Sequence, residues 1–166
     1  MLDIMKKRRS CRTYDGKKVT GEEMDKGIEA GLWAPTGMNR QRVMLVGVQD
    51  EETVSALSKM NAAVMGSAND PFYGAKSVVV VFADADVPTW VEDGSLAMGN
   101  MMNEAEELGL GSCWIHRTKE TFETEEGREI LRNLGITDEY EGIGNCILGY
   151  ADEAPEAAAA VVLPGD

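Results

Sequence analysis

The chain has 166 residues, enough for one domain with a buried core, and its hydrophobic content of 43% is ordinary for a globular protein. The formal net charge of −13 argues against nucleic acid as a partner, because binding to a phosphate backbone requires extended positive charge. The longest apolar run, residues 78–83, is far too short to cross a bilayer. We therefore expect a single domain over residues 1–166 with no membrane partner, ending in an acidic and alanine-rich tail at 152–166.

The three cysteines, Cys11, Cys113 and Cys146, are scattered along the chain without a paired spacing. This pattern favours free thiols in a reducing compartment over a disulfide framework. The basic residues 6–9 run into polar residues and not into an apolar stretch, so they do not resemble the start of a signal peptide. Together these features predict a cytoplasmic protein.

A basic cluster, Arg8-Arg9-Ser10-Cys11-Arg12, closes a predicted short helix over residues 2–9. Residues 1–18 hold seven basic and two acidic side chains in an otherwise acidic chain. Such concentrated positive charge suggests one specific anion, since the guanidinium of arginine pairs with phosphate through two hydrogen bonds. The cluster is equally typical of the solvated basic end of a short helix, where cations are favourable.

The sequence Thr20-Gly21-Glu22-Glu23 is a capping box that predicts the start of a helix, and Pro35 predicts its end. A loop over residues 34–41 follows. The segment 43–48 is apolar on both faces, which indicates a buried strand. Further along we expect a helix over 50–60, a loop or lid over 66–76 and a second buried strand over 77–82.

A second capping box, Thr89-Trp90-Val91-Glu92, predicts a helix that ends at Gly109. Its apolar stripe and nearly uncharged middle indicate burial on most sides. A strand over 112–115, a helix over 124–134 with Leu134 facing inward, and a last strand over 143–150 complete the chain. Helices and strands thus alternate around one sheet.

Few residues of the chain are suited to acid–base, nucleophilic or metal chemistry. His116 is the only histidine, and no Gly-x-Ser-x-Gly elbow is present, which argues against a hydrolytic triad. Cys113 and His116 could form a thiol nucleophile only if the fold brought them together. The dispersed cysteines give no metal-ligand spacing, so we expect no metal. A chain with so few reactive side chains suggests that a bound cofactor carries the reaction.

Four segments resemble motifs of the nitroreductase-like family of flavin enzymes, in the family's order. Residues 8–12 resemble the Arg-Arg-Ser-x-Arg motif that opens the family, and residues 35–41 resemble its Pro-Ser-x-x-Asn-x-Gln loop. Residues 108–115 are similar to its Leu-Gly-Leu-Gly-Ser-Cys-Trp-Ile segment, and residues 147–150 to its closing strand. The resemblance covers nearly the whole chain.

The resemblance implies an α+β fold: a three-layer sandwich with a central mixed, mainly antiparallel sheet flanked by helices. It also implies a domain-sharing homodimer that binds FMN at its interface. Arg8, Arg9 and Ser10 would hold the phosphate and the ribityl chain. Arg12 would lie beside the pyrimidine edge of the flavin, where a cation stabilises the negative charge of the reduced ring.

Two further segments would complete the flavin site according to the same resemblance. The partner subunit would contribute a loop that contacts the ring and the ribityl chain. The end of the strand after the long helix would border the other edge of the ring, with a backbone N–H donating to N5. The residues concerned are Pro35, Thr36, Gly37, Asn39 and Gln41 in the loop, and Ile115, His116 and Arg117 after the strand.

The implied reaction is hydride transfer from NADH or NADPH, through N5 of FMN, to a nitroaromatic, a quinone or a similar two-electron acceptor by a ping-pong mechanism. No side chain is required as a catalytic acid or base. The alternative is a flavin-binding storage or sensor protein of the same fold with little turnover. Individual residues also have simpler interpretations: Asn39 and Gln41 could satisfy loop backbone groups, and His116 could be an exposed strand end.

The sequence departs from the family pattern in three places, and the departures near the phosphate and after Gln41 favour that alternative. Arg42-Val43 stand where the family has Pro-Trp. Asp152, Glu153 and Glu156 follow the final Gly-Tyr, where the family has basic residues that reach the phosphate. The segment that would cover the site is reduced to residues 61–74. These differences concern cofactor affinity and substrate choice more than the fold.

Overall fold

Four antiparallel strands form the central sheet of the computed structural model, which describes residues 1–137 and 139–153. The strand order is β1-β2-β4-β3, and every neighbouring pair is antiparallel. Among the described residues, parallel pairing is limited to an isolated bridge between Ser10 and Ser112, outside the four strands. The strands are β1 (Val43–Val48), β2 (Ser77–Asp84), β3 (Gly111–Ile115) and β4 (Tyr140–Gly149).

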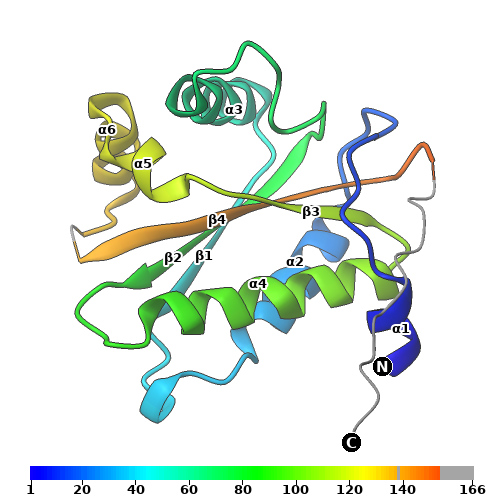
Figure 1. The fold of residues 1–166 in the computed structure, drawn as a ribbon, viewed down its shortest axis with the longest axis horizontal. Helices are drawn as coiled ribbons and strands as arrows, with labels where there is room; N and C mark the ends of the chain where they lie inside the picture. The colour runs from blue at the N-terminus through cyan, green and yellow to red at the C-terminus, as the bar shows by residue number, and fades with distance from the viewer. Residues whose placement is uncertain (138, 154–166) are drawn as a thin grey trace, which may run out of the picture.

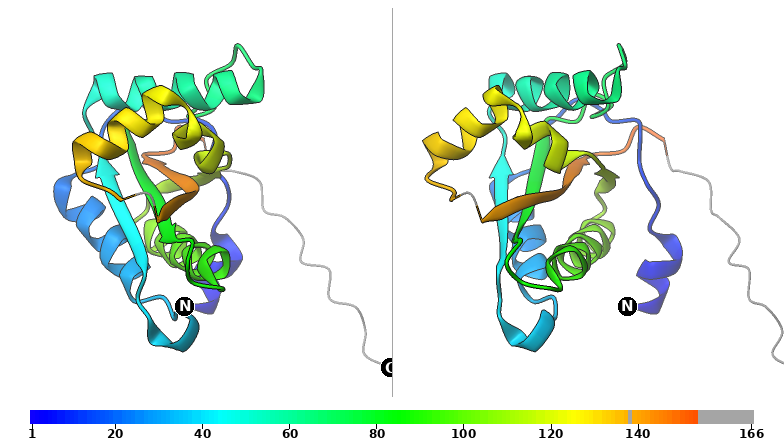
Figure 2. Two further views of the ribbon diagram at one scale, coloured as in Figure 1. Left: turned by 90° about the vertical axis from the view of Figure 1, so that its left-hand side faces the viewer. Right: turned by 60° about the vertical axis from the view of Figure 1, so that its left-hand side comes forward.

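Helices cover both faces of the sheet and give the fold three layers (Figure 1; Figure 2). One face carries α3, α5 and α6, and the other carries α2 and α4, with α1 beside α4. The predicted α+β sandwich is confirmed. The helices are α1 (Leu2–Lys7), α2 (Gly21–Leu32), α3 (Glu51–Met65), α4 (Trp90–Glu107), α5 (Thr118–Glu123) and α6 (Glu125–Leu134), with a short 3-10 turn at Gly37–Asn39.

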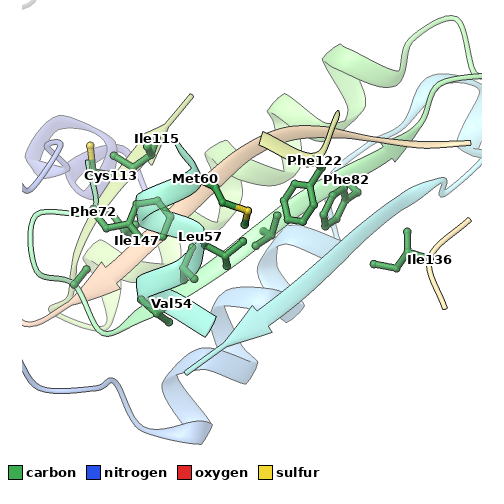
Figure 3. Packing of buried hydrophobic residues seen from close by; sticks show 13 residues of the cluster. Val54, Leu57, Met60, Phe72, Phe82, Cys113, Ile115, Phe122, Ile136 and Ile147 are labelled. Atoms are coloured by element: carbon green, nitrogen blue, oxygen red, sulfur yellow. The ribbon is translucent and has the colours of Figure 1, made fainter. Parts of the chain in front are cut away.

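The alternating side chains of β2 contribute to two hydrophobic cores. Val78, Val80 and Phe82 join the core under α3 and α5, which Figure 3 shows from close by. Val79 and Val81 join the core under α2 and α4. All of β2 is buried, because it lies between β1 and β4 with a helical layer on each face.

The strand β1 lies at the edge of the sheet and is only half-buried. Its apolar sequence predicted a buried strand, and this prediction is wrong for the single chain. The reason is positional: an apolar pattern shows that both faces can be covered, but it does not reveal whether the strand has neighbours on both sides.

The two predicted capping boxes have different outcomes. Thr20 accepts a hydrogen bond from the backbone N–H of Glu23, whose side chain accepts from the Thr20 N–H, as predicted. Thr89 makes no capping hydrogen bond, so the second capping box is wrong. Its hydroxyl instead donates to Asp93 Oδ2 at 3.1 Å.

Other boundaries differ from the sequence-based expectations in modest ways. The helix α3 continues past residue 60, and the short helix α5 was not predicted. Leu134 is 55% exposed and does not face inward, because core contact from α6 is made by Ile130 and Leu131. The predicted tail lies outside the described residues from 154 onward. Among the described residues, no helix combines the length and apolar character needed to span a membrane.

Candidate functional site

The predicted anion-binding residues lie on the segment after α1, which runs along the edge of β3. The bridge between Ser10 and Ser112 holds this segment, and the N–H of Cys11 donates to the Ser112 carbonyl at 2.8 Å. Arg8 and Ser10 are half-buried, and Arg12 is exposed. Attachment to the sheet therefore fixes the backbone of the basic cluster while Arg12 remains accessible.

The charges of this segment are only partly compensated within the chain. Although the sequence has 29 aspartates and glutamates, neither Arg8 nor Arg12 forms an ion pair with a carboxylate of the described residues. Arg9 donates through Nη1 to the carbonyls of Lys6 (2.8 Å) and Arg8 (2.6 Å). Arg8 and Arg12 thus remain available to an anionic ligand.

The predicted flavin loop is held together by its own side chains. Thr36 Oγ1 accepts from the backbone N–H (3.1 Å) and from Nε2 (3.2 Å) of Gln41, and Asn39 Oδ1 accepts from the same Nε2 at 2.9 Å. Asn39 and Gln41 have positive φ angles of 54° and 53°, as has Met38 at 54°. Strained non-glycine residues of this kind cluster at functional sites. Pro35, like Asn39 and Gln41, is exposed.

Asp93 in α4 anchors this loop, and the sequence analysis did not identify it. The side chain is 3% exposed. Its Oδ1 accepts from the Gly37 N–H at 2.8 Å, while its Oδ2 accepts from the Thr89 hydroxyl. A side chain at position 37 would collide with Thr89, so the approach of the loop requires glycine. In the sequence, Asp93 is visible only as an acidic residue in the first turn of a helix, which does not distinguish it from a solvent-exposed residue.

Replacing Asp93 by alanine should lower the free energy of unfolding by about 1–3 kcal/mol, because the Gly37 N–H loses its acceptor in a partly buried place. Asp93→Asn should lose less, since an amide can accept from Gly37 and donate to Thr89. Urea unfolding of both variants measures the difference. Parent-like stability of Asp93→Ala would show that the loop does not depend on this anchor.

The third predicted segment follows β3. Ile115 is buried in the core, and His116 and Arg117 are exposed. Arg117 has a φ of 70° at the start of α5, and its Nη1 lies 3.9 Å from Glu120 Oε1. The fully buried Asn61 of α3 donates from Nδ2 to the His116 carbonyl at 2.7 Å. This contact, not predicted from the sequence, fixes the turn from the opposite layer.

A thiol nucleophile finds no support in this geometry. Cys113 is buried, and burial raises the pKa of its thiol, although Arg12 partly opposes this effect. Burial also raises the pKa of Cys146 to about 12. No hydrogen bond joins Cys113 to His116. In the part of the chain that the structure describes, no cluster of three potential metal ligands is found.

A sequence model of the Nitroreductase family matches residues 5–150. The chain belongs to the Nitroreductase family. It is 31% identical over 155 residues, 90% of this chain and 84% of the relative, to an Archaeoglobus fulgidus protein provisionally named NADH dehydrogenase/NAD(P)H nitroreductase. The family and the oxidoreductase class predicted from the sequence are thereby confirmed.

Two solved structures extend the comparison to the fold. A Bacteroides fragilis nitroreductase with bound FMN superimposes with a TM-score of 0.86 at 27% identity, covering 99% of this chain and 95% of that one. An FMN-dependent nitroreductase from Clostridium difficile gives a TM-score of 0.80 at 30% identity, covering 96% and 92%. The nitroreductase fold therefore extends over nearly the whole chain.

In a single nitroreductase chain, the predicted halves of the site lie at opposite ends of α4. The loop packs on the first turn of α4 through Asp93, and the basic segment meets Ser112 after the last turn (Figure 1). An 18-residue helix is about 27 Å long at 1.5 Å per residue. One chain therefore does not bring the two halves together.

A groove of about 950 Å³ between α3 and the start of α6 is not a substitute for this site. It contains none of the residues identified above, and it is lined largely by exposed side chains such as Glu51, Ser55 and Lys59. Since the halves of the predicted site are separated within one chain, an enclosed cavity around them is not expected there.

Proposed function

We propose that this protein is an FMN-dependent oxidoreductase that uses NADH or NADPH to reduce a nitroaromatic, a quinone or a similar two-electron acceptor in a ping-pong reaction. The observation that carries the proposal is the pair of arginines, Arg8 and Arg12, held beside β3 without a carboxylate partner among the described residues. In a chain with a net charge of −13, two cations without a carboxylate partner concentrate positive potential at one place, where an anion can bind.

The side chains present fit this cofactor. Arg8 offers charge-assisted hydrogen bonds to a phosphate, and the half-buried Ser10 offers a hydroxyl donor. Arg9 keeps the segment folded through its own backbone contacts. Arg12 supplies a cation for the pyrimidine edge of the flavin. The chemistry that FMN supplies when bound is hydride transfer at N5, so side chains need only bind, orient and tune it.

The other predicted residues complete the proposed site from two further places. The partner subunit contributes the preorganised loop, whose exposed polar groups face outward from its own chain. The turn after β3 supplies a backbone donor, with its conformation fixed by Asn61 from the opposite layer. These residues are Pro35, Thr36, Gly37, Asn39 and Gln41 in the loop, and Ile115, His116 and Arg117 in the turn.

The proposed assembly is a homodimer. Large apolar side chains are exposed on α1, at the end of α2, in the loop and on α4, including Trp33 at 79% and Met38 at 86%. Exposed apolar surface on this scale is typical of an interface. Pairing of these faces would place the loop of one chain near the basic segment of the other. We keep a cytoplasmic location as part of the proposal, in line with three free thiols.

A storage or sensor protein is the second candidate. It is favoured by the exposed acidic residues Asp152 and Glu153 after β4, and by the pairing of Arg117 with Glu120, which leaves Arg117 less available to the phosphate. Both candidates bind FMN, so colour alone does not separate them.

Turnover separates the two candidates. A fully flavin-loaded sample should oxidise NADH or NADPH in the presence of a quinone or nitroaromatic, and its absorbance should bleach when either nucleotide is added anaerobically. The comparison of NADH with NADPH gives the preference. A loaded protein that is bleached by neither nucleotide, and turns over neither acceptor, would instead support storage.

A further inference from the structure

The exposed guanidinium of Arg12 faces an aromatic ring. Its Cζ lies 6.0 Å from the centroid of Tyr73, in the α3–β2 connection that the sequence predicted as a loop or lid. We propose that Tyr73 is a positioning residue that holds Arg12 in place without neutralising its charge. The inference rests on the proposed function, in which Arg12 is the cation beside the flavin.

An aromatic ring and a carboxylate would affect the charge of Arg12 differently. A carboxylate would also fix Arg12, but it would cancel the charge that an anionic ligand needs. The face of an aromatic ring attracts a guanidinium through its quadrupole and carries no net charge. No described carboxylate lies within ion-pairing distance of Arg12, in a chain that has 29 of them. The ring therefore orients the cation and leaves it available.

The loop that presents the ring is fixed on both sides of Tyr73. The carboxylate of Asp70 accepts from the N–H of Phe72 (2.9 Å), from the N–H of Gly74 (2.7 Å) and from the hydroxyl of Ser58 in α3. Phe72 is 1% exposed and belongs to the core in Figure 3. Because its two neighbours are held in this way, Tyr73 has little freedom to leave Arg12.

The backbone of Tyr73 is strained although the side chain adds little to the core. Its φ is 52°, followed by 78° at Gly74, and the side chain is 41% exposed. A bulky residue in the left-handed region is an outlier that costs free energy, and glycine would fit there without strain. A strained, exposed tyrosine is therefore better explained by its contact with Arg12 than by packing.

Arg12 is also positioned from the other side. The neighbouring N–H of Cys11 donates to the Ser112 carbonyl at 2.8 Å, which fixes the backbone next to Arg12 to β3. The charge of Arg12 also lowers the pKa of the Cys113 thiol, in opposition to the larger effect of burial. The backbone beside Arg12 is thus held by the sheet edge, and its guanidinium by the ring of Tyr73. Removal of the ring would leave the backbone of Arg12 in place but take away the contact that orients its guanidinium.

Two substitutions at position 73 separate this role from a structural one. Tyr73→Phe keeps the ring face, so FMN affinity and midpoint potential should match the parent. Tyr73→Gly removes the ring and relieves the positive φ. It should resist urea at least as well as the parent, bind FMN about two- to five-fold more weakly, and show a lower flavin midpoint potential. These measurements use the full-length protein, and neither requires turnover.

The double variant completes the test. In an Arg12→Ala background, Tyr73→Gly should change neither affinity nor potential further, because the ring acts through Arg12. Parent-like affinity and potential for Tyr73→Gly would overturn the inference, and so would a loss of equal size in the Arg12→Ala background. A parent protein that binds no FMN would instead overturn the proposed function, and the inference with it.

Discussion

Replacing Arg8 by alanine should weaken FMN binding by about 1.5–3 kcal/mol, because the variant loses a charge-assisted hydrogen bond to the phosphate. Arg12→Ala should have a second effect. The cation near the pyrimidine edge favours the more negatively charged reduced flavin, so its loss should lower the midpoint potential and slow reduction by NADH or NADPH. The measurements are FMN affinity and midpoint potential for the two variants side by side.

The matched control is Arg128→Ala, which removes an exposed arginine from α6. It should leave both quantities unchanged. If the basic cluster were only a solvated helix end, Arg8→Ala and Arg12→Ala would behave like this control. Added salt would then matter as much as mutation, because exposed charges are screened. Parent-like FMN binding by both arginine variants would mean that the cofactor binds elsewhere.

Mixing two inactive variants should restore activity if each site is shared between subunits. One variant carries Arg8→Ala and Arg12→Ala, and the other carries Asn39→Ala and Gln41→Ala. In a symmetric mixed dimer, one site has both defects and the other has none, so an equal mixture exchanged at random should recover about one quarter of the sites. The measurement is FMN bound and NAD(P)H turnover after subunits are exchanged.

The control for this experiment mixes Arg8→Ala with Arg12→Ala. Both changes lie on the same half of the site, so every mixed site keeps one defect and nothing is restored. Light scattering should show a dimer, whose interface we expect to bury well above about 2,000 Å² in total. A monomer at micromolar concentration that still binds FMN would contradict the shared site.

The sequence predicted those features that depend on neighbouring residues. The capping box at Thr20 and the apolar run of β2 are local patterns, and both were correct. The same kind of pattern misled at Thr89, where the hydroxyl bonds to Asp93 instead of the backbone. The edge position of β1 depends on the order of the strands in the sheet, and the apolar sequence of a single strand does not specify that order.

The residues of the candidate site also divide into those that the sequence predicted and those that only the fold revealed. The basic cluster and the loop were found as motifs, because each is continuous in sequence. Asp93 and Asn61 were missed because their roles depend on contacts between distant segments: Asp93 bonds to Gly37 across 56 positions, and Asn61 bonds to His116 across 55. Tyr73 was missed for the same reason, since only the fold brings its loop to Arg12.

The edge position of β1 also bears on aggregation. Its sequence, Val-Met-Leu-Val-Gly-Val, carries no charge, and one side of the strand has no strand partner in the described part of the chain. Uncharged apolar edges of this kind are templates for cross-β pairing between copies of a protein. Arg42 and Asp50 stand on either side of the strand as charged gatekeepers, which oppose such stacking. We therefore expect that replacing these two flanking charges would raise the tendency of the β1 edge to pair between copies of the chain.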